Sequence, residues 1–115
     1  KADVAATEEI GFTGLHRASQ GGHAECVRVL LESKADVAAT NKHGTTGLHM
    51  ASEGGHAECV RVLLKSKADV AARSMGFGNT GLLRDGATGL HYASVGGHSE
   101  CVRVLLASKA DVAAV

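Results

Sequence analysis

The stretch that decides the fold is Thr-Gly-Leu-His-Arg-Ala-Ser-Gln-Gly-Gly-His-Ala-Glu-Cys-Val-Arg-Val-Leu-Leu at residues 13–31, which returns almost unchanged at residues 46–64 and 88–106. A second motif, Lys-Ala-Asp-Val-Ala-Ala, marks the start of each copy, at Lys1, Lys34, Lys67 and Lys109. We therefore treat the chain as one domain, 1–115, built from the repeats 1–33, 34–66 and 67–108 and a partial repeat 109–115. Self-similarity at such a period is typical of arrays in which each copy packs on its neighbours.

Each repeat is predicted to hold two short helices. Thr13 can cap the first helix, because its hydroxyl can accept a hydrogen bond from a free backbone N–H of the first turn, and Gly21–Gly22 ends it. In the second helix, apolar side chains dominate residues 26–31, whereas Glu25 and Arg28 lie on the opposite side. Isolated helices of about three turns are marginal in water. Each repeat must therefore bury its apolar side against the next, which predicts an all-α solenoid.

The motif Thr-Gly-Leu-His-x-Ala-Ser-x-Gly-Gly-His-x-Glu-Cys-Val-Arg-Val-Leu-Leu-x-Ser-Lys-Ala-Asp-Val-Ala-Ala resembles the ankyrin repeat over essentially the whole chain. The resemblance implies antiparallel helix pairs stacked into a curved array, with β-turn fingers that project from one side. It also implies that the chain binds another protein through the finger tips and the concave face of the first helices. In the family, the histidine of each Thr-x-Leu-His motif ties adjacent fingers to helices; here these are His16, His49 and His91.

The chain departs from the family pattern at two kinds of backbone position. Gly14, Gly47 and Gly89 stand where the family usually has proline, a residue whose fixed φ suits the first helical position. Lysine stands at Lys1, Lys34, Lys67 and Lys109 where the family usually has glycine. A left-handed backbone at such a lysine costs on the order of 1 kcal/mol. We expect these changes to lower stability and to leave the fold intact.

Composition narrows the range of functions. The chain has 115 residues, twelve basic and twelve acidic, and a formal charge of zero, so it lacks the basic footprint of a nucleic-acid or anionic-membrane binder. No apolar run approaches the roughly 20 residues that span a bilayer. Three cysteines and no visible secretory signal lead us to expect an intracellular, cytoplasmic protein.

The differences between the repeats indicate where a partner binds. Repeats one and two differ mainly at finger-tip and first-helix positions, whereas the outer residues of the second helix, such as Glu25 and Arg28, do not change. This pattern favours a constant scaffold with a variable contact surface; neutral drift at exposed sites is the alternative. The predicted partner-binding residues are Glu9, Ile10, Phe12, Arg17, Gln20, Lys42, His43, Thr45, Met50, Glu53, Met75, Phe77, Leu82, Leu83, Arg84, Tyr92 and Val95.

The third repeat carries an insertion, residues 73–87, that we interpret as an extended finger. Its glycines disfavour a regular helix, yet it contains apolar residues that an ordinary solvated loop lacks. These either contact a partner or cover the edge of a neighbouring repeat. All three aromatic residues of the chain, Phe12, Phe77 and Tyr92, lie at variable positions or in this insertion, and exposed aromatic side chains are common interface anchors. We expect Tyr92→Ala to weaken binding with little loss of helicity.

Metal, disulfide and catalytic chemistry find little support in the sequence. Each repeat contains His-x-x-Cys, as at His23 and Cys26, but such a pair supplies two ligands where a structural zinc needs four. The cysteine is expected in the core, where it acts as a small hydrophobe. Equivalent cysteines of stacked repeats would lie about 10 Å apart, beyond the reach of a disulfide. No catalytic arrangement stands apart from the repeat template, so we expect neither an enzyme nor a cofactor.

Two further questions stay open from the sequence alone. The chain begins and ends within a repeat, and its terminal repeats keep the core pattern of the middle one, whereas solenoids normally end in polar capping repeats. The alternative to a protein-binding module is therefore a scaffold segment of a longer array, or a fragment that self-associates end to end, without a ligand of its own. Near-identical repeats that vary at contact positions also resemble a designed ankyrin library. A natural, recently duplicated array is the alternative, since a designed one would normally keep the proline and glycine missing here.

Overall fold

The repeated sequence folds into three pairs of α-helices. A computed structural model describes residues 13–42, 44–69, 72–73 and 88–108. The three first helices are α1 (Gly14–Gly21), α3 (Gly47–Gly54) and α5 (Gly89–Val95). The three second helices are α2 (Ala24–Glu32), α4 (Ala57–Lys65) and α6 (Ser99–Ala107). All regular structure among the described residues is helical, as the sequence predicts.

The predicted cap residues set the helix boundaries. Thr13 precedes α1 with an extended backbone, and its Oγ1 accepts a hydrogen bond from the His16 amide at 3.3 Å. The α1 helix then ends at Gly22, whose φ of 77° lies in the left-handed region that a Cβ disfavours. Thr46 and Gly55 repeat this arrangement around α3. The sequence prediction of the first helix is therefore confirmed at both ends.

The two lysines that replace glycine after the second helices do adopt the left-handed backbone. Lys34 and Lys67 both have a φ of 75°. Each follows a serine that caps α2 or α4, at Ser33 and Ser66, and its amide donates to a carbonyl of the last helical turn. The repeat geometry therefore fixes this conformation even where a side chain makes it unfavourable by roughly 1 kcal/mol.

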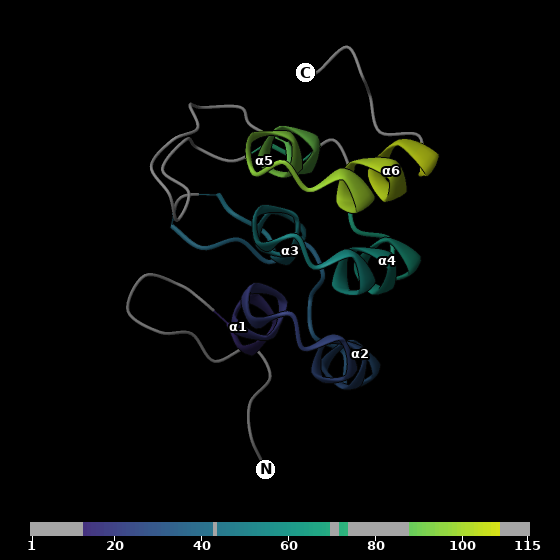
Figure 1. Ribbon diagram of the computed structural model, residues 1–115. Helices are drawn as coiled ribbons and strands as arrows, with labels where there is room; N and C mark the ends of the chain where they lie inside the picture. Colours follow the sequence, from purple (N-terminus) through teal and green to yellow (C-terminus); the bar gives the residue numbers. More distant parts are fainter. Residues whose placement is uncertain (1–12, 43, 70–71, 74–87, 109–115) are drawn as a thin grey trace.

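The helix pairs stack in sequence order into two layers. Figure 1 shows α1, α3 and α5 in one layer and α2, α4 and α6 in the other, with each helix packed on its pair mate and on the next repeat. The molecule is elongated, with extents of 42 × 26 × 19 Å. This is the predicted modular array, because each repeat supplies part of the interior of the next.

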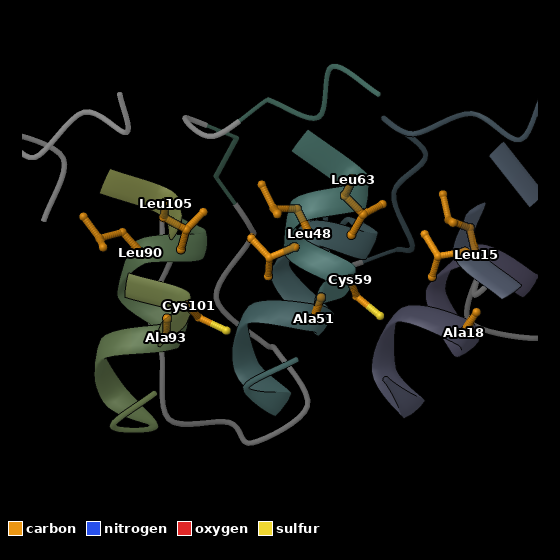
Figure 2. Close-up of a cluster of buried hydrophobic side chains, with 12 residues drawn as sticks. Leu15, Ala18, Leu48, Ala51, Cys59, Leu63, Leu90, Ala93, Cys101 and Leu105 are labelled. Atoms are coloured by element: carbon orange, nitrogen blue, oxygen red, sulfur yellow. The ribbon is translucent and has the colours of Figure 1, made fainter. Parts of the chain in front are cut away.

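The core runs between the two layers as a repeated set of small side chains. Figure 2 shows Leu48 and Ala51 of α3 beside Leu63 and Cys59 of α4, and the same four residue types at the α5–α6 pair. One predicted core residue differs: Cys26 of α2 is exposed, whereas Cys59 and Cys101 are buried and all three thiols are free. Cys26 is exposed because the face of α2 that carries it lies at the start of the stack.

Candidate functional site

A threonine–histidine bracket stands at the start of the first helix in all three repeats. At the start of α1, the Thr13 amide donates to His16 Nδ1 at 3.0 Å, while Thr13 Oγ1 accepts from the His16 amide. The same two bonds join Thr46 to His49 and Thr88 to His91. Because Nδ1 accepts a hydrogen bond from a backbone amide, the neutral ring must carry its own proton on Nε2.

That Nε2 proton fixes the finger of the following repeat. His16 Nε2 lies 2.8 Å from the Thr45 carbonyl oxygen, and His49 Nε2 lies 2.9 Å from the Ala72 carbonyl oxygen. Burial lowers the pKa of His16 below its ordinary 6.5, although the bond to the Thr45 carbonyl acts in the opposite direction. The resemblance implied this role for the histidines, and the structure confirms it for His16 and His49.

The second finger is a closed turn with a buried base. The Asn41 amide donates to the Thr45 carbonyl at 3.1 Å, and Asn41 Oδ1 accepts from the Thr45 amide at 3.1 Å. Gly44 makes the turn, with a φ of 71° and an amide bond to the Asn41 carbonyl. Asn41 and Thr45 are both buried, whereas Lys42 is exposed at the tip. The placement of Thr45 among the contact residues is therefore corrected: it is the anchor of the finger.

The remaining predicted contact residues fall into three groups. Arg17, Lys42 and Val95 are exposed, and Gln20 and Glu53 are half-buried. Thr45, Met50 and Tyr92 are buried. The rest lie outside the described residues: Glu9, Ile10, Phe12, His43, Met75, Phe77, Leu82, Leu83 and Arg84.

Met50 and Tyr92 are stacking residues, which corrects their assignment as exposed anchors. Only 1% of Met50 and 2% of Tyr92 is exposed. The Tyr92 ring of α5 lies against the His49 ring of α3, with centroids 5.2 Å apart and planes tilted by 56°. Arg17 occupies the equivalent position on α1 and is exposed there. In α3 and α5 this position therefore faces the preceding repeat.

A partly exposed row at the ends of the first helices fits the predicted contact surface better. Gln20, Glu53 and Val95 occupy equivalent positions on α1, α3 and α5, so they follow one another across the stack. Val95 is 54% exposed, which is unusual for a large apolar side chain in this molecule. Arg17 donates to Gln20 Oε1 at 2.9 Å at one end of the row. We call Gln20, Glu53 and Val95 the variable row.

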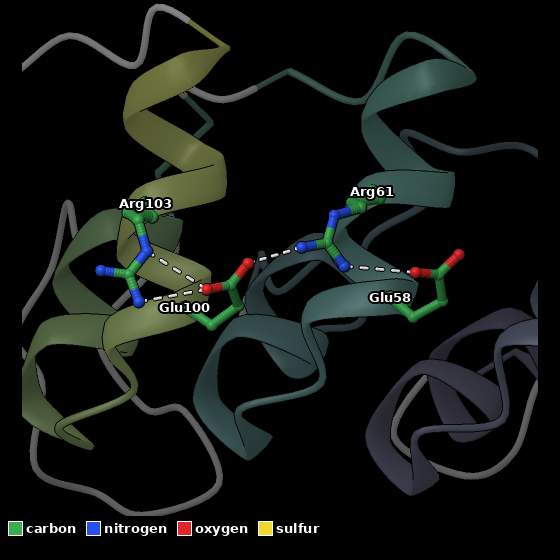
Figure 3. Close-up of polar contacts among 4 residues, drawn as sticks. All are labelled: Glu58, Arg61, Glu100 and Arg103. Atoms are coloured by element: carbon green, nitrogen blue, oxygen red, sulfur yellow. Dashed lines mark hydrogen bonds and ion pairs between the residues drawn. The ribbon is translucent and has the colours of Figure 1, made fainter.

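The second helices carry a constant charged surface on the opposite layer. Within one helix, Arg28 pairs with Glu25 and Arg61 pairs with Glu58. Figure 3 shows that Arg61 also reaches the next repeat, where its Nη2 lies 2.6 Å from Glu100 Oε2. Sequence reasoning placed the Glu and Arg positions on the outer side of the second helices and missed this bond between repeats, which the recurrence of Glu and Arg at the repeat spacing could have indicated.

The longest helices among the described residues have nine residues. In this part of the chain, no helix has the length and apolar character that crossing a bilayer requires. Likewise, these residues contain no cluster of three or more His, Cys, Asp or Glu side chains placed to hold a metal ion.

Comparison with known families agrees with the architecture. A family model described as ankyrin repeats (3 copies) matches residues 1–74, and one described as ankyrin repeat matches residues 85–115. No curated protein matches the chain. Ankyrin repeats are generally modules for protein–protein interaction. With its capped helix pairs, its histidine brackets and these two matches, the chain belongs to the ankyrin repeat family.

Proposed function

We propose that the chain is a protein-binding module whose partner contacts the variable row together with the tips of the fingers. The observation that carries this proposal is the contrast between two surfaces. Gln20, Glu53 and Val95 differ in every repeat and are at least partly exposed, whereas the equally exposed Glu and Arg positions of the second helices keep their identity. Because the variable row changes between repeats while the exposed Glu and Arg positions of the second helices stay constant, we assign the contact function to the variable row.

The rigidity of the scaffold supports the same function. Among the described residues, the histidine brackets bond the second and third repeats to the first helix of the preceding repeat, through His16 to Thr45 and through His49 to Ala72. A contact surface that is already ordered loses little conformational entropy on binding. The residues available to a partner combine the exposed Val95 and Lys42 with the half-buried Glu53, so they offer an aliphatic side chain and charges of both signs. The predicted contacts at Phe12 and Phe77 would add aromatic anchors to this surface.

The test compares capture by two variants of equal charge. The row variant, Gln20→Lys with Val95→Lys, adds two positive charges to the variable row. The control, Glu32→Lys, changes the charge by the same amount at an exposed α2 position where the second repeat already has Lys65. The proposal expects proteins captured by the unaltered chain at high dilution to be lost with the row variant and kept with the control. Equal capture by all three forms would refute it.

A variant with a shortened insertion tests in the same experiment whether the inserted finger belongs to the contact surface. A chain in which the segment 73–87 is cut to ordinary finger length keeps the variable row and the histidine brackets. Loss of capture with this chain, together with loss in the row variant, would extend the contact surface to the inserted finger. Retained capture would confine the contact surface to the row and the shorter fingers.

A further inference from the structure

The outer layer of second helices carries a groove that the proposed function does not use. The groove lies between α2 and α4 and has a volume of about 550 Å³. We propose that it binds an acidic segment of a partner protein, whose carboxylates meet lysines at the mouth of the groove while an aliphatic side chain rests on its floor. This goes beyond the proposed function, because the variable row lies on the opposite layer of the stack (Figure 1).

The walls of the groove come from two consecutive repeats. Leu31 of α2 and Val62 of α4 are half-buried, whereas Arg28 and Lys65 on the two walls are exposed. We call Leu31 and Val62 the floor of the groove and the exposed charged side chains its rim. A volume between about 300 and 1,000 Å³ is usual for a ligand cleft. The groove therefore has room for a few side chains of a partner.

The groove contains the position at which the three second helices differ in charge. Glu32 of α2 corresponds to Lys65 of α4 and to Ala107 of α6, whereas the Glu25 and Arg28 positions keep their identity. Glu32 and Lys65 both line the groove and are exposed. Neither forms an ion pair with another described residue. The outer layer therefore keeps its paired charges constant and varies at a groove position whose charge is available to a partner.

The next interface of the same kind is bridged by an ion pair. Between α4 and α6, Arg61 Nη2 lies 2.6 Å from Glu100 Oε2 (Figure 3). Arg28 occupies the equivalent position on α2, but it pairs with Glu25 of its own helix. The groove between α2 and α4 is therefore open at the place where the interface between α4 and α6 is spanned.

The backbone is strained at the mouth of the groove. Lys67 directly follows Ser66, the last residue of the α4 wall, and Lys34 is its counterpart after α2. Both lysines are exposed, and both have a φ of 75°. This left-handed region suits glycine and is unfavourable for a residue with a Cβ. Residues held in such conformations cluster at functional sites, so the strain indicates that these lysine side chains are used.

The helix dipole alone does not account for the strained lysines. Positive charges are favourable near the C-terminus of a helix, but Lys65 already supplies one in the last turn of α4, where the backbone is helical. Lys67 adds a second positive charge two residues later, in a conformation that glycine would adopt without strain. The excess positive charge at this end of the groove is therefore available for an anionic group.

The distribution of charge favours a protein segment over a nucleic acid. Lys34, Lys65 and Lys67 gather at the mouth of the groove, whereas Glu32 and Glu58 lie in its walls. A nucleic-acid strand carries a phosphate on every nucleotide and would bring some of them against these two carboxylates. An acidic peptide can place its carboxylates at the lysines and an aliphatic side chain on the floor. The formal charge of zero for the whole chain agrees with this choice.

The experiment measures the fluorescence anisotropy of labelled probes at low salt. The main probe is a peptide of about twelve residues with glutamates on both sides of a central leucine, and an oligouridylate of similar length supplies a polyanion. We expect the acidic peptide to bind with a dissociation constant below about 1 mM, and about tenfold more tightly than a peptide with glutamine in place of glutamate. No binding of the acidic peptide at that concentration would overturn the proposal. Tighter binding of the oligouridylate would do so as well.

A double variant separates binding from stability. Lys34→Gly with Lys67→Gly relieves the strained backbone, so the midpoint of urea unfolding should rise. The same variant removes two positive charges from the mouth of the groove, so its affinity for the acidic peptide should fall by about tenfold. A purely structural part for the two lysines predicts no loss of affinity in a chain that has become more stable. Unchanged affinity for the acidic peptide would therefore overturn the proposal.

Two variants that change the net charge equally locate the site. Glu32→Lys reverses a charge in the wall of the groove and should strengthen binding of the acidic peptide by about threefold. The row variant, Gln20→Lys with Val95→Lys, adds the same charge on the opposite layer and should leave the affinity within about twofold. Equal strengthening by both would show that net charge decides the affinity, and would overturn the proposal. Capture through the variable row is measured separately, so either function can fail while the other stands.

Discussion

The first and second repeats share most of their residues and yet differ in what those residues do. Leu63 and Cys59 are inaccessible in α4, whereas Leu30 is half-buried and Cys26 exposed in α2. The sequence is the same at these positions; the difference is the presence of a repeat on the preceding side. Burial in a solenoid is therefore a property of position in the stack, and an end repeat is the same module with one interface open.

The strongest test of this comparison substitutes one repeat position twice, in the interior of the stack at Tyr92 and at its end at Arg17. Tyr92→Ala removes a buried ring and should lower the free energy of unfolding by about 3–5 kcal/mol. Arg17→Ala, at the equivalent exposed position, should change it by less than about 0.5 kcal/mol. Urea unfolding of both variants measures the contrast. Similar losses for the two would show that this position does not face the preceding repeat.

The Tyr92 result bears on what sequence can predict. Helix boundaries followed from Thr13 and Gly22, because caps act through neighbouring backbone groups. The left-handed lysines followed from the repeat register. The burial of Met50 and Tyr92 did not follow from the sequence. A position that varies between repeats looks the same whether its side chain contacts a partner or a neighbouring repeat. The exposure of Cys26 depended on which face of a repeat meets the preceding one, which only packing in three dimensions decides.

The reactivity of the three cysteine thiols gives a second comparison between the interior and the end of the stack. Burial raises the pKa of the Cys59 and Cys101 thiols; Glu58 adds to the rise at Cys59, whereas at Cys101 the Arg61 charge opposes the rise and Glu100 adds to it. A buried thiol reacts only when the structure opens locally. At high dilution we expect an alkylating reagent to modify Cys26 about a hundredfold faster than the other two cysteines. Peptide mapping over time reports the three rates, and equal rates would contradict the described burial.

The buried His16 makes the interior bracket sensitive to acid. Its pKa in the folded protein is lowered, mainly by desolvation, whereas the unfolded chain has the ordinary value of 6.5. The unfolded state therefore binds the proton first as the pH falls, and the stability that the neutral ring contributes above pH 6.5 is lost progressively below it. We expect a His16 titration midpoint below 6.5 by NMR. We also expect a smaller loss of stability between pH 7.5 and 5.5 in His16→Gln; a midpoint at or above 6.5 would refute the assignment.

The same glycine-to-alanine substitution should change stability differently at the end and in the interior of the stack, by up to about 1 kcal/mol. Gly14→Ala should stabilise α1 by up to about 1 kcal/mol through helix propensity, since its Cβ would meet only the Leu30 side chain, at 3.9 Å. Gly47→Ala should gain less, because its Cβ would lie 3.0 Å from Ser19 Oγ.

A double variant, Gly47→Ala with Ser19→Ala, isolates the contact between position 47 and Ser19 Oγ. Ser19 Oγ is buried and makes no hydrogen bond to the described residues, so Ser19→Ala should itself be tolerated or stabilising. Adding it to Gly47→Ala should restore the full gain from alanine. A double-mutant cycle measures the coupling. Strict additivity of the Ser19 and Gly47 substitutions would contradict a contact between these positions.

The smallest expected difference lies on the outer charged surface. Arg61 bonds Glu58 within α4 and Glu100 in the next repeat, whereas the ion pair of Arg28 is with Glu25 of its own helix. Exposed pairs are each worth about 0.2–1 kcal/mol and weaken with salt. Arg61→Ala should therefore destabilise the chain by roughly 0.5 kcal/mol more than Arg28→Ala at low salt. The gap should close in 1 M salt, because the Debye length there is only about 3 Å. A gap that persists at high salt would assign the effect to packing of the Arg61 side chain rather than to its charge.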